Sequence, residues 1–169
     1  NSEEWGETED YTVIVTSAGP VLPSADFSAS ETTICEGESI TFTNLSSDAD
    51  SYEWSFTGGT PSSSTDTDPV VVYNTAGTYS VTLIATNTDG STTETKTDYI
   101  SVGAPPTLST NVTNVNCFDG SDGAIDLTVT GGHSPFTYSW SPSGSTQNLS
   151  GLTSGTYSVT ITDNYGCSN

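Results

Sequence analysis

The six residues GTYSVT at positions 77–82 recur unchanged at positions 155–160. In each copy an aromatic or branched side chain alternates with a polar one, which is the period of a strand with one buried face. Each copy also follows a strand-like run that contains Tyr-x-Trp, SYEWSF at 51–56 and TYSWS at 137–141. The repetition indicates two modules of one architecture in tandem.

Turn-forming clusters rich in Gly, Pro, Ser and Asp separate these short runs, and helical periodicity is hard to find. Many short strands at such spacing predict an all-β fold, with two tandem immunoglobulin-like antiparallel β-sandwiches. The tyrosine of each GTYSVT copy is expected to bond through its hydroxyl to nearby backbone, as in a tyrosine corner. The side chains expected in the two cores are Tyr52, Trp54, Phe56, Tyr79, Tyr138, Trp140 and Tyr157.

Residues 104–106, Ala-Pro-Pro, form the expected linker, because consecutive prolines favour a short and stiff extended connection. The expected modules are therefore residues 21–103 and 104–169. Residues 1–20 belong to neither module, and the alternating run at 10–16 predicts an extra N-terminal strand. Since a lone strand cannot bury its face, it either ends a preceding domain or is donated to a neighbour by β-augmentation.

The chain carries 21 Asp and Glu against a single Lys and no Arg, for a formal net charge of −20. This balance excludes a nucleic-acid binder and a polybasic membrane contact, and it leaves no cation to anchor several phosphorylated or carboxylated groups. No run approaches the ~20 apolar residues of a membrane span. The low apolar content, 31%, is typical of disorder, but 8 Tyr, 5 Phe and 3 Trp argue for packed cores. We therefore assign the charge to turns and solvent faces.

Residues 24–102 resemble a PKD domain, an immunoglobulin-like β-sandwich. The motifs that carry this resemblance are YEWSF at 52–56, DPVVVY at 68–73 and AGTYSVTL at 76–83. In place of the usual Gly-Asp-Gly after the Trp-x-Phe strand, the chain has TGGTP at 57–61, which is similar to a Bacteroidota-type variant.

Residues 105–169 resemble an SprB-type repeat of gliding-motility adhesins. The matching parts are CFDGSDG at 117–123, PFTYSWS at 135–141, GL at 151–152 and DNYGC at 163–167. The run GETEDY at 6–11 is similar to the closing strand of a GEVED domain.

Together these resemblances imply part of a longer, secreted or cell-surface protein of a Bacteroidota-like bacterium, exported by type IX secretion. Parents of this kind include adhesins and multidomain peptidases, and any catalytic domain is expected outside these residues. The implied partners are extracellular protein or polysaccharide surfaces or neighbouring domains of the same chain, and neither nucleic acid nor membrane insertion is expected.

The three cysteines fit an extracellular setting, and their odd number leaves at least one without a partner in the chain. Cys117 opens the second module and Cys167 nearly closes it, so we expect a disulfide between them. Such a bridge stabilises a small core by ~4 kcal/mol in the chain-entropy model. The alternative is two separate thiols. Cys35, beside Ile34, is expected to be a buried thiol that acts as a small apolar side chain.

Two acidic clusters are candidate calcium sites, because hard cations take several oxygen ligands. Asp48 and Asp50 lie in a loop that holds calcium in some PKD domains of secreted peptidases, although the chain lacks their Asn-rich entry segment. Asp119, Asp122 and Asp126 form the second cluster, with part of an EF-hand spacing but no closing Glu. For both clusters the alternative is a solvated turn.

No catalytic pattern stands out. His133 is the single histidine, in a loop without a neighbouring Cys or His, and no Ser-His-Asp order, zinc-protease motif or P-loop occurs. The first hypothesis is therefore a non-catalytic extracellular segment of adhesive or spacer modules. The alternatives are accessory modules of a secreted hydrolase that bind collagen or polysaccharide through exposed aromatic side chains, and a filament subunit with a donated N-terminal strand.

Overall fold

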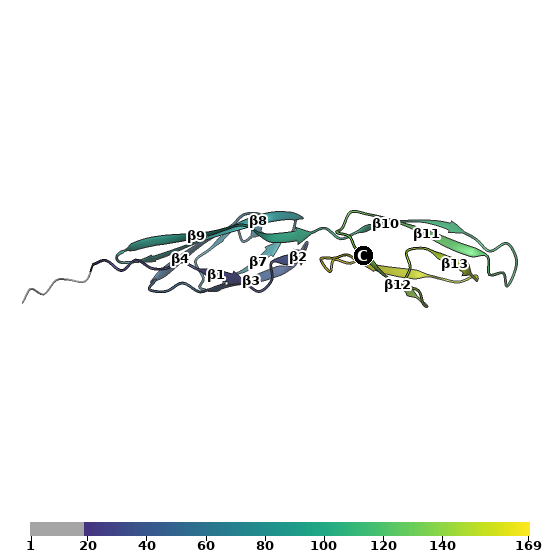
Figure 1. The fold of residues 1–169 in the computed structure, drawn as a ribbon, viewed down its shortest axis with the longest axis horizontal. Coiled ribbons are helices and arrows are strands. Elements are labelled where there is room, and N and C mark those ends of the chain that lie inside the picture. The colour runs from purple at the N-terminus through teal and green to yellow at the C-terminus, as the bar shows by residue number, and fades with distance from the viewer. Residues whose placement is uncertain (1–18) are drawn as a thin grey trace, which may run out of the picture.

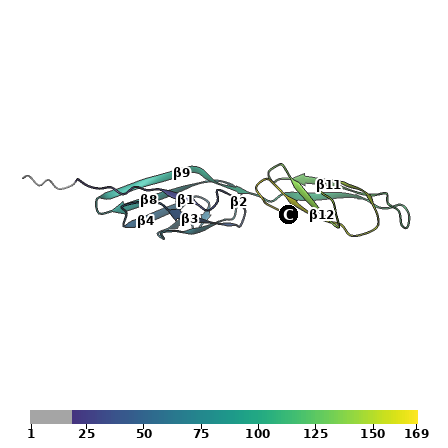
Figure 2. The ribbon, with the colours of Figure 1, turned by 60° about the horizontal axis from the view of Figure 1, so that its bottom comes forward.

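The computed structural model describes residues 19–169, which form two β-sandwiches joined end to end in an elongated rod (Figure 1). Strands β1–β9 build the first sandwich and β10–β14 the second, and a view turned by 60° shows the same end-to-end order (Figure 2). The prediction of an all-β chain of tandem sandwiches is confirmed. The search for a helix able to cross a membrane finds none in residues 19–169. The strand expected at residues 10–16 lies outside the described residues.

The first sandwich consists of two sheets. One has the strand order β1 (Phe27–Ala29), β3 (Ser39–Asn44), β7 (Val70–Tyr73) and β5 (Gly59–Thr60). The other has the order β2 (Thr33–Cys35), β9 (Gly90–Gly103), β8 (Gly77–Asn87), β4 (Ser51–Phe56) and β6 (Ser63–Ser64). All pairs are antiparallel except β2 with β9, which brings Cys35 opposite Gly103 at the end of β9.

The core of the first sandwich follows from strict alternation along its strands. In β4, Trp54 and Phe56 are buried while Glu53 and Ser55 face solvent, as expected for a strand between a core and water. Trp54 packs edge-on against Phe27, with ring centroids 5.3 Å apart, and its indole nitrogen donates to the Asp66 carbonyl at 2.9 Å. Among residues 19–169, twelve buried apolar side chains form this cluster.

The second sandwich is thinner. Its sheets have the orders β10 (Thr107–Thr113), β11 (Gly123–Thr130), β13 (Leu149–Leu152) and β12 (Thr137–Ser141), β14 (Ser158–Thr162). Within the described residues its buried apolar cluster is Ile125, Leu127, Trp140 and Ile161. Trp140 repeats the arrangement of Trp54, because its indole nitrogen donates to the Thr146 carbonyl at 2.8 Å.

The expected tyrosine corners are confirmed in both sandwiches. The Tyr79 hydroxyl donates to the Thr75 carbonyl at 2.7 Å, and the Tyr157 hydroxyl donates to the Thr153 carbonyl at 3.0 Å. The four tyrosines expected in the cores are half-buried and pack against the core clusters, in contrast to the buried Trp54, Phe56 and Trp140: Tyr52, Tyr79, Tyr138 and Tyr157. Their hydroxyls need polar partners, which keeps these side chains at the margin of each core.

Candidate functional site at the junction of the two sandwiches

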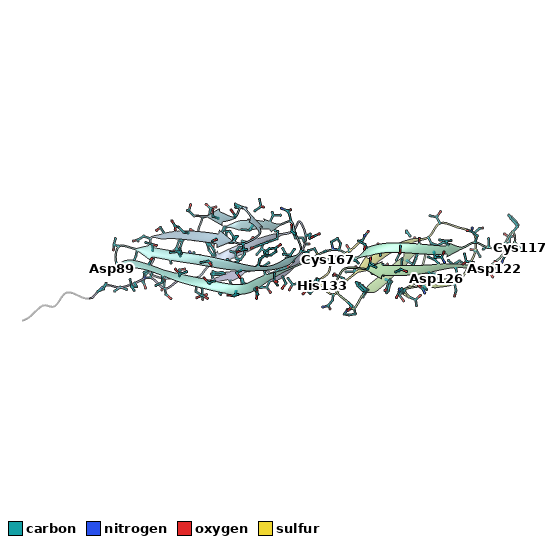
Figure 3. All side chains as sticks on the ribbon, turned by 90° about the horizontal axis from the view of Figure 1, so that it is seen from above. Asp89, Cys117, Asp122, Asp126, His133 and Cys167 are labelled. Carbon is teal, nitrogen blue, oxygen red and sulfur yellow. A yellow bond between two sulfur atoms is a disulfide. The ribbon has the colours of Figure 1, made fainter. Side chains whose placement is uncertain are left out.

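A disulfide joins the two sandwiches. Cys35, at the end of β2, is bonded to Cys167, which follows β14, and their Cα atoms lie 5.4 Å apart. The two cysteines are 132 residues apart in sequence. Figure 3 places Cys167 at the boundary between the sandwiches. The sandwiches are therefore connected twice, once by the chain after Gly103 and once by the disulfide.

The expected pairing of Cys117 with Cys167 is wrong. Figure 3 shows Cys117 at the outer end of the second sandwich and Cys167 at the inner end, whereas a disulfide requires Cα atoms within about 7 Å. Cys117 is exposed and unpaired in the described part of the chain. The reason is that β10 separates the junction from Cys117, so the cysteine that opens the module in sequence lies at its far end in space. Cys35, expected as a buried thiol, supplies the partner instead.

The turn that carries Cys167 is organised by the buried carboxylate of Asp163, which is 6% exposed. One carboxylate oxygen accepts the backbone N–H groups of Tyr165 and Cys167, each at 2.9 Å. The other accepts the backbone N–H of His133 at 2.9 Å. The Asn164 N–H donates to the His133 carbonyl at 2.8 Å. Because charge-assisted bonds to backbone are strong, this carboxylate fixes both the turn and the adjoining His133 loop.

The side chains of Tyr165 and Cys167 lie against Gly103 of the first sandwich. The His133 ring stacks on the Tyr165 ring, with centroids 3.9 Å apart and planes 8° from parallel. A Cβ at Gly103 would lie 2.8 Å from Tyr165 Cδ2 and 3.1 Å from the Cys167 sulfur. The close approach of the second sandwich therefore requires glycine at the end of β9. Asn169 reinforces the joint by donating its side-chain N–H to the Pro106 carbonyl at 2.8 Å.

An open cleft of about 350 Å³ lies at the junction, with lining residues from both sandwiches: Ala76, Gly77, Thr78, Ser101, Val102, His133 and Tyr165. His133 is the histidine among these residues, and the Nδ1 atom of its ring lies 3.8 Å from the buried Asp163 carboxylate. The arrangement positions a ring stack and a turn, and the cleft contains no nucleophile–base pair of a catalytic centre.

The candidate calcium ligands are not gathered into a full site. In residues 19–169 no group of three or more His, Cys, Asp or Glu lies close enough to hold a metal. The Asp48 carbonyl accepts the Asn87 side-chain amide at 2.7 Å, and the Asp50 N–H donates to the Thr86 carbonyl at 2.8 Å. These bonds organise the Asp48 and Asp50 loop through protein partners, and calcium binding there stays a prediction.

The second acidic cluster is likewise dispersed. Asp122 accepts the backbone N–H of Asn116 at 3.1 Å and also its side-chain amide. These hydrogen bonds hold the pKa of Asp122 below its ordinary value of 3.8. Asp126 lies on β11, opposite Asn111 of β10, and Asp119 occupies a left-handed turn position. Asp119, Asp122 and Asp126 therefore do not converge on one point.

The one lysine of the chain has a structural role. Lys96 Nζ lies 3.1 Å from an Asp26 carboxylate oxygen, bonds to the Phe27 carbonyl and stands 4.6 Å from the centre of the Phe27 ring. The hydrogen bond from Lys96 holds the pKa of Asp26 below its ordinary value of 3.8. This cation is therefore engaged by groups of the PKD-side sandwich itself.

The two sandwiches match known families. Residues 20–102 match the family model of the PKD domain, and residues 109–145 match that of the SprB repeat. The chain carries a PKD domain followed by an SprB repeat. The resemblance of residues 24–102 to a PKD domain is thereby confirmed, and that of residues 105–169 to an SprB repeat is confirmed over residues 109–145. The similarity of residues 6–11 to a GEVED domain and the Bacteroidota origin stay predictions. Both matched families are non-catalytic modules typical of surface proteins.

No curated protein matches the chain. Solved structures of similar shape include one titled for the promiscuous specificity of carbohydrate-binding modules from the β-sandwich superfamily, with 21% identity and a TM-score of 0.44. That match covers 73% of this chain and 66% of the other, so the chain spans just under two thirds of it.

Two further structures come from a bacterium and a phage. Fibronectin(III)-like modules of Clostridium thermocellum CbhA have 14% identity and a TM-score of 0.43, and the match covers 85% of this chain and 88% of that one. Three N-terminal domains of the outer capsid protein Hoc of bacteriophage RB49 have 18% identity and a TM-score of 0.38, over 82% and 54% of the two chains. At these identities the likeness gives no indication of a ligand.

Proposed function

We propose that this chain is a rigid, non-catalytic spacer of an extracellular surface protein, which holds adjoining parts away from the cell and presents loops for adhesion. The observation that carries the proposal is the disulfide between Cys35 and Cys167, which ties the PKD domain to the SprB repeat. A disulfide between modules also suits an oxidising, extracellular location. Export by the type IX route belongs to the same proposal.

The double connection restricts relative motion. Two domains joined by one linker are expected to reorient freely unless their interface is large. Here the linker leaves from Gly103 and the disulfide returns to Cys35, which pairs with Gly103 in the adjacent strand. Two attachments close together, with the Tyr165 ring packed against Gly103, oppose both bending and twisting. A stiff joint is what a spacer needs.

The net charge of −20 serves the same role. Self-repulsion keeps a strongly acidic extracellular chain soluble and discourages unspecific pairing of exposed strand edges. The charge lies on turns and outer faces, since Asp163 is the one charged side chain buried in residues 19–169.

The substrate-binding alternative keeps only part of its support from the sequence. It relied on aromatic side chains in a row on an exposed sheet face, but Trp54 and Trp140 are buried, and the half-buried Tyr52 and Tyr138 pack against the cores. The large apolar side chain with the greatest exposure in the described residues is Phe118, at 96%, in the loop after β10.

Residual dipolar couplings test the spacer proposal, because a 17.5 kDa chain is suited to NMR. In the oxidised protein one alignment tensor should fit the amide couplings of both sandwiches. After Cys35→Ser with Cys167→Ser, two different tensors should be needed while each sandwich keeps its native chemical shifts. Cys117→Ser is the matched control and should behave as the unaltered chain. Two independent tensors in the oxidised protein would refute a rigid spacer.

A further inference from the structure

One edge of the PKD domain is formed by β1 and the residues that flank it. β1 is the outermost strand of its sheet, and β3 is its strand neighbour. The backbone groups of Ser24, Asp26 and Ser30 bond to β3 or to the residues just after it, at 2.8 to 3.0 Å. In an antiparallel pair, alternate residues direct both backbone groups to the same side. Three residues therefore direct theirs to the free edge: Ala25, Phe27 and Ala29.

Side chains of β9, a strand of the opposite sheet, occupy both ends of this edge. The Ala25 N–H donates to the Thr92 hydroxyl at 3.1 Å, and that hydroxyl donates to the Pro23 carbonyl at 2.9 Å. Thr92 thereby supplies both an acceptor and a donor, as a residue of a neighbouring strand would. At the other end, the Ala29 N–H donates to the Tyr99 hydroxyl at 3.1 Å. Both ends of the edge are therefore closed without a further strand.

Lys96 lies between these two side chains on β9 and occupies the middle of the edge. Its ammonium group bonds to the Phe27 carbonyl and lies 3.1 Å from a carboxylate oxygen of Asp26. The same oxygen accepts the Phe27 N–H at 2.7 Å. The ammonium also stands over the rings of Phe27 and Tyr99, 4.6 and 5.4 Å from their centres. The ion pair of Lys96 and Asp26 therefore holds both backbone groups of Phe27.

This position suits a side chain that blocks strand addition. An edge with unpaired backbone groups is a template for pairing with another chain, and native proteins protect such edges with lysines and with charges that point inward. Lys96 stands opposite Val81 of β8, whose side chain is buried, so both lie on the inner face of the sheet. A strand that paired with Phe27 would displace the ammonium from its partners and leave a charge beside the apolar core, which is unfavourable.

We propose that Lys96, with Thr92 and Tyr99, is a gatekeeper that prevents two chains from pairing at the edge beside β1. The partner that it excludes is a second copy of this chain. Without these three side chains, two copies would pair antiparallel about a two-fold axis at Phe27, with Ala25 opposite Ala29 of the second copy. Such a contact is isologous and stops at the dimer. The proposal goes beyond the spacer function and does not depend on it.

The gatekeeper acts apart from the overall charge of the chain. Repulsion between exposed charges is screened within ~3 Å in 1 M salt, whereas side chains that fill an edge stay in place. Replacing Lys96 by a neutral residue changes the net charge from −20 to −21. A variant of this kind that associates more strongly than the unaltered chain does so against a larger repulsion, so its association reports the opened edge.

Sedimentation velocity in ~1 M NaCl tests the proposal on the unaltered chain and on Lys96→Met with Tyr99→Phe. Methionine keeps an apolar stem, and phenylalanine keeps the ring beside Phe27, but the ammonium and the hydroxyl are gone. The double variant should form a dimer with an association constant at least ~10-fold above that of the unaltered chain, which corresponds to about 1.4 kcal/mol. The amide NMR signals of Phe27 and Ala29 should shift with its concentration.

Two controls accompany the double variant. Glu94→Met makes the same kind of replacement two residues away in the same row of β9, opposite the buried Leu83, and should sediment as the unaltered chain does. Lys96→Arg keeps the charge and the donors and should restore the unaltered behaviour when it replaces Lys96→Met in the double variant. If Lys96→Met fails to fold by NMR, Lys96→Val takes its place, because β-branched residues favour strands.

A folded double variant that sediments as the unaltered chain does at every concentration would overturn the proposal. Association that leaves the amide signals of residues 25–29 unchanged also contradicts it, since the contact then lies elsewhere. Equal association of Glu94→Met contradicts it as well, because loss of a charge alone would then explain the effect. The dipolar couplings of the unaltered chain report on the spacer function separately.

Discussion

The PKD domain and the SprB repeat share a strand pattern, a tyrosine corner and a central tryptophan, but they differ in how much core they enclose. The buried apolar cluster of the first sandwich has twelve side chains and that of the second has four, counted over residues 19–169. A small core rarely supplies more than ~3–5 kcal/mol by itself. The second sandwich therefore depends on external support from the disulfide to Cys35. The same motif can build a self-sufficient module or a dependent one.

Replacing each central tryptophan by alanine should give the largest difference in stability between the two modules. Trp140→Ala is expected to unfold the SprB repeat, because losing a buried Trp costs ~3–5 kcal/mol, which is the whole stability of so small a core. Trp54→Ala should cost a similar amount and leave the PKD domain folded but weakened. Amide NMR spectra of the two variants provide the measurement. An intact SprB repeat in Trp140→Ala would show that its core is larger than its four buried side chains indicate.

Removal of the disulfide should affect the modules unequally. In Cys35→Ser with Cys167→Ser, the SprB repeat is expected to lose ~2–4 kcal/mol, whereas the PKD domain should change little because its larger core closes within its own two sheets. Module-resolved hydrogen exchange measures both values in one sample, with Cys117→Ser as the control. Equal losses in the two modules would mean that they unfold as one unit.

Gly103→Ala should weaken the junction directly. The added methyl meets Tyr165 Cδ2 at 2.8 Å, and overpacking of this kind costs ~1–3 kcal/mol. Gly155→Ala is the control, since its new methyl would have its nearest contact at 3.6 Å, to Tyr157 Cε2. Thermal unfolding followed by NMR distinguishes the two. A neutral Gly103→Ala would argue that the joint is loose.

The two tyrosine corners allow the same hydrogen bond to be removed from each module and the losses of stability to be compared. Tyr79→Phe and Tyr157→Phe each remove one hydroxyl bond to a backbone carbonyl, and each should cost about 1 kcal/mol in its own module. Tyr73→Phe is the matched control. Its buried hydroxyl has no hydrogen-bond partner in the described residues, and burial raises its pKa to about 12, so its removal should be neutral or stabilising. Denaturant unfolding gives the three values.

The smallest expected effect is on acid stability. The pKa values of Asp26 and Asp122 are lowered in the folded state by hydrogen bonds from Lys96 and Asn116. Such groups stabilise the fold at pH values above the unfolded pKa, and the contribution is lost as the pH falls from about 4 through the lower folded pKa. Asp26→Asn should reduce the fall in melting temperature of the PKD domain at acid pH, and Asp122→Asn should do the same for the SprB repeat. Melting temperatures between pH 2 and 5 test both, and an unchanged fall contradicts the assignment.

Much of the fold could be predicted because it rests on local patterns. The alternation in residues 51–56 and 77–82 decides which side chains face the core, and the Gly-Thr-Tyr start decides where the corner tyrosine bonds. The half-burial of Tyr52 and Tyr138 was harder to predict, since strand period alone cannot distinguish the centre of a core from its margin.

The junction could not be predicted, because it depends on contacts between distant residues. β2 has three residues and pairs in parallel with the end of β9, a pairing that leaves no periodic signal yet brings Cys35 to the joint. The sequence shows that Cys117 and Cys167 flank one module but not that they lie at its opposite ends. Asp163 appears as an ordinary turn aspartate, and its three backbone hydrogen bonds emerge only when the His133 loop folds against it.

The disulfide also determines how the chain responds to a pulling force. Tension applied between residue 19 and Asn169 passes from Cys35 directly to Cys167, so the 132 residues of separation enclosed by the bond carry no load. Without the bond, unravelling would release roughly 440 Å of chain at about 3.3 Å per residue. With it, only the short segments outside the loop can extend. The SprB repeat, the weaker module, is thereby shielded from mechanical unfolding along this path.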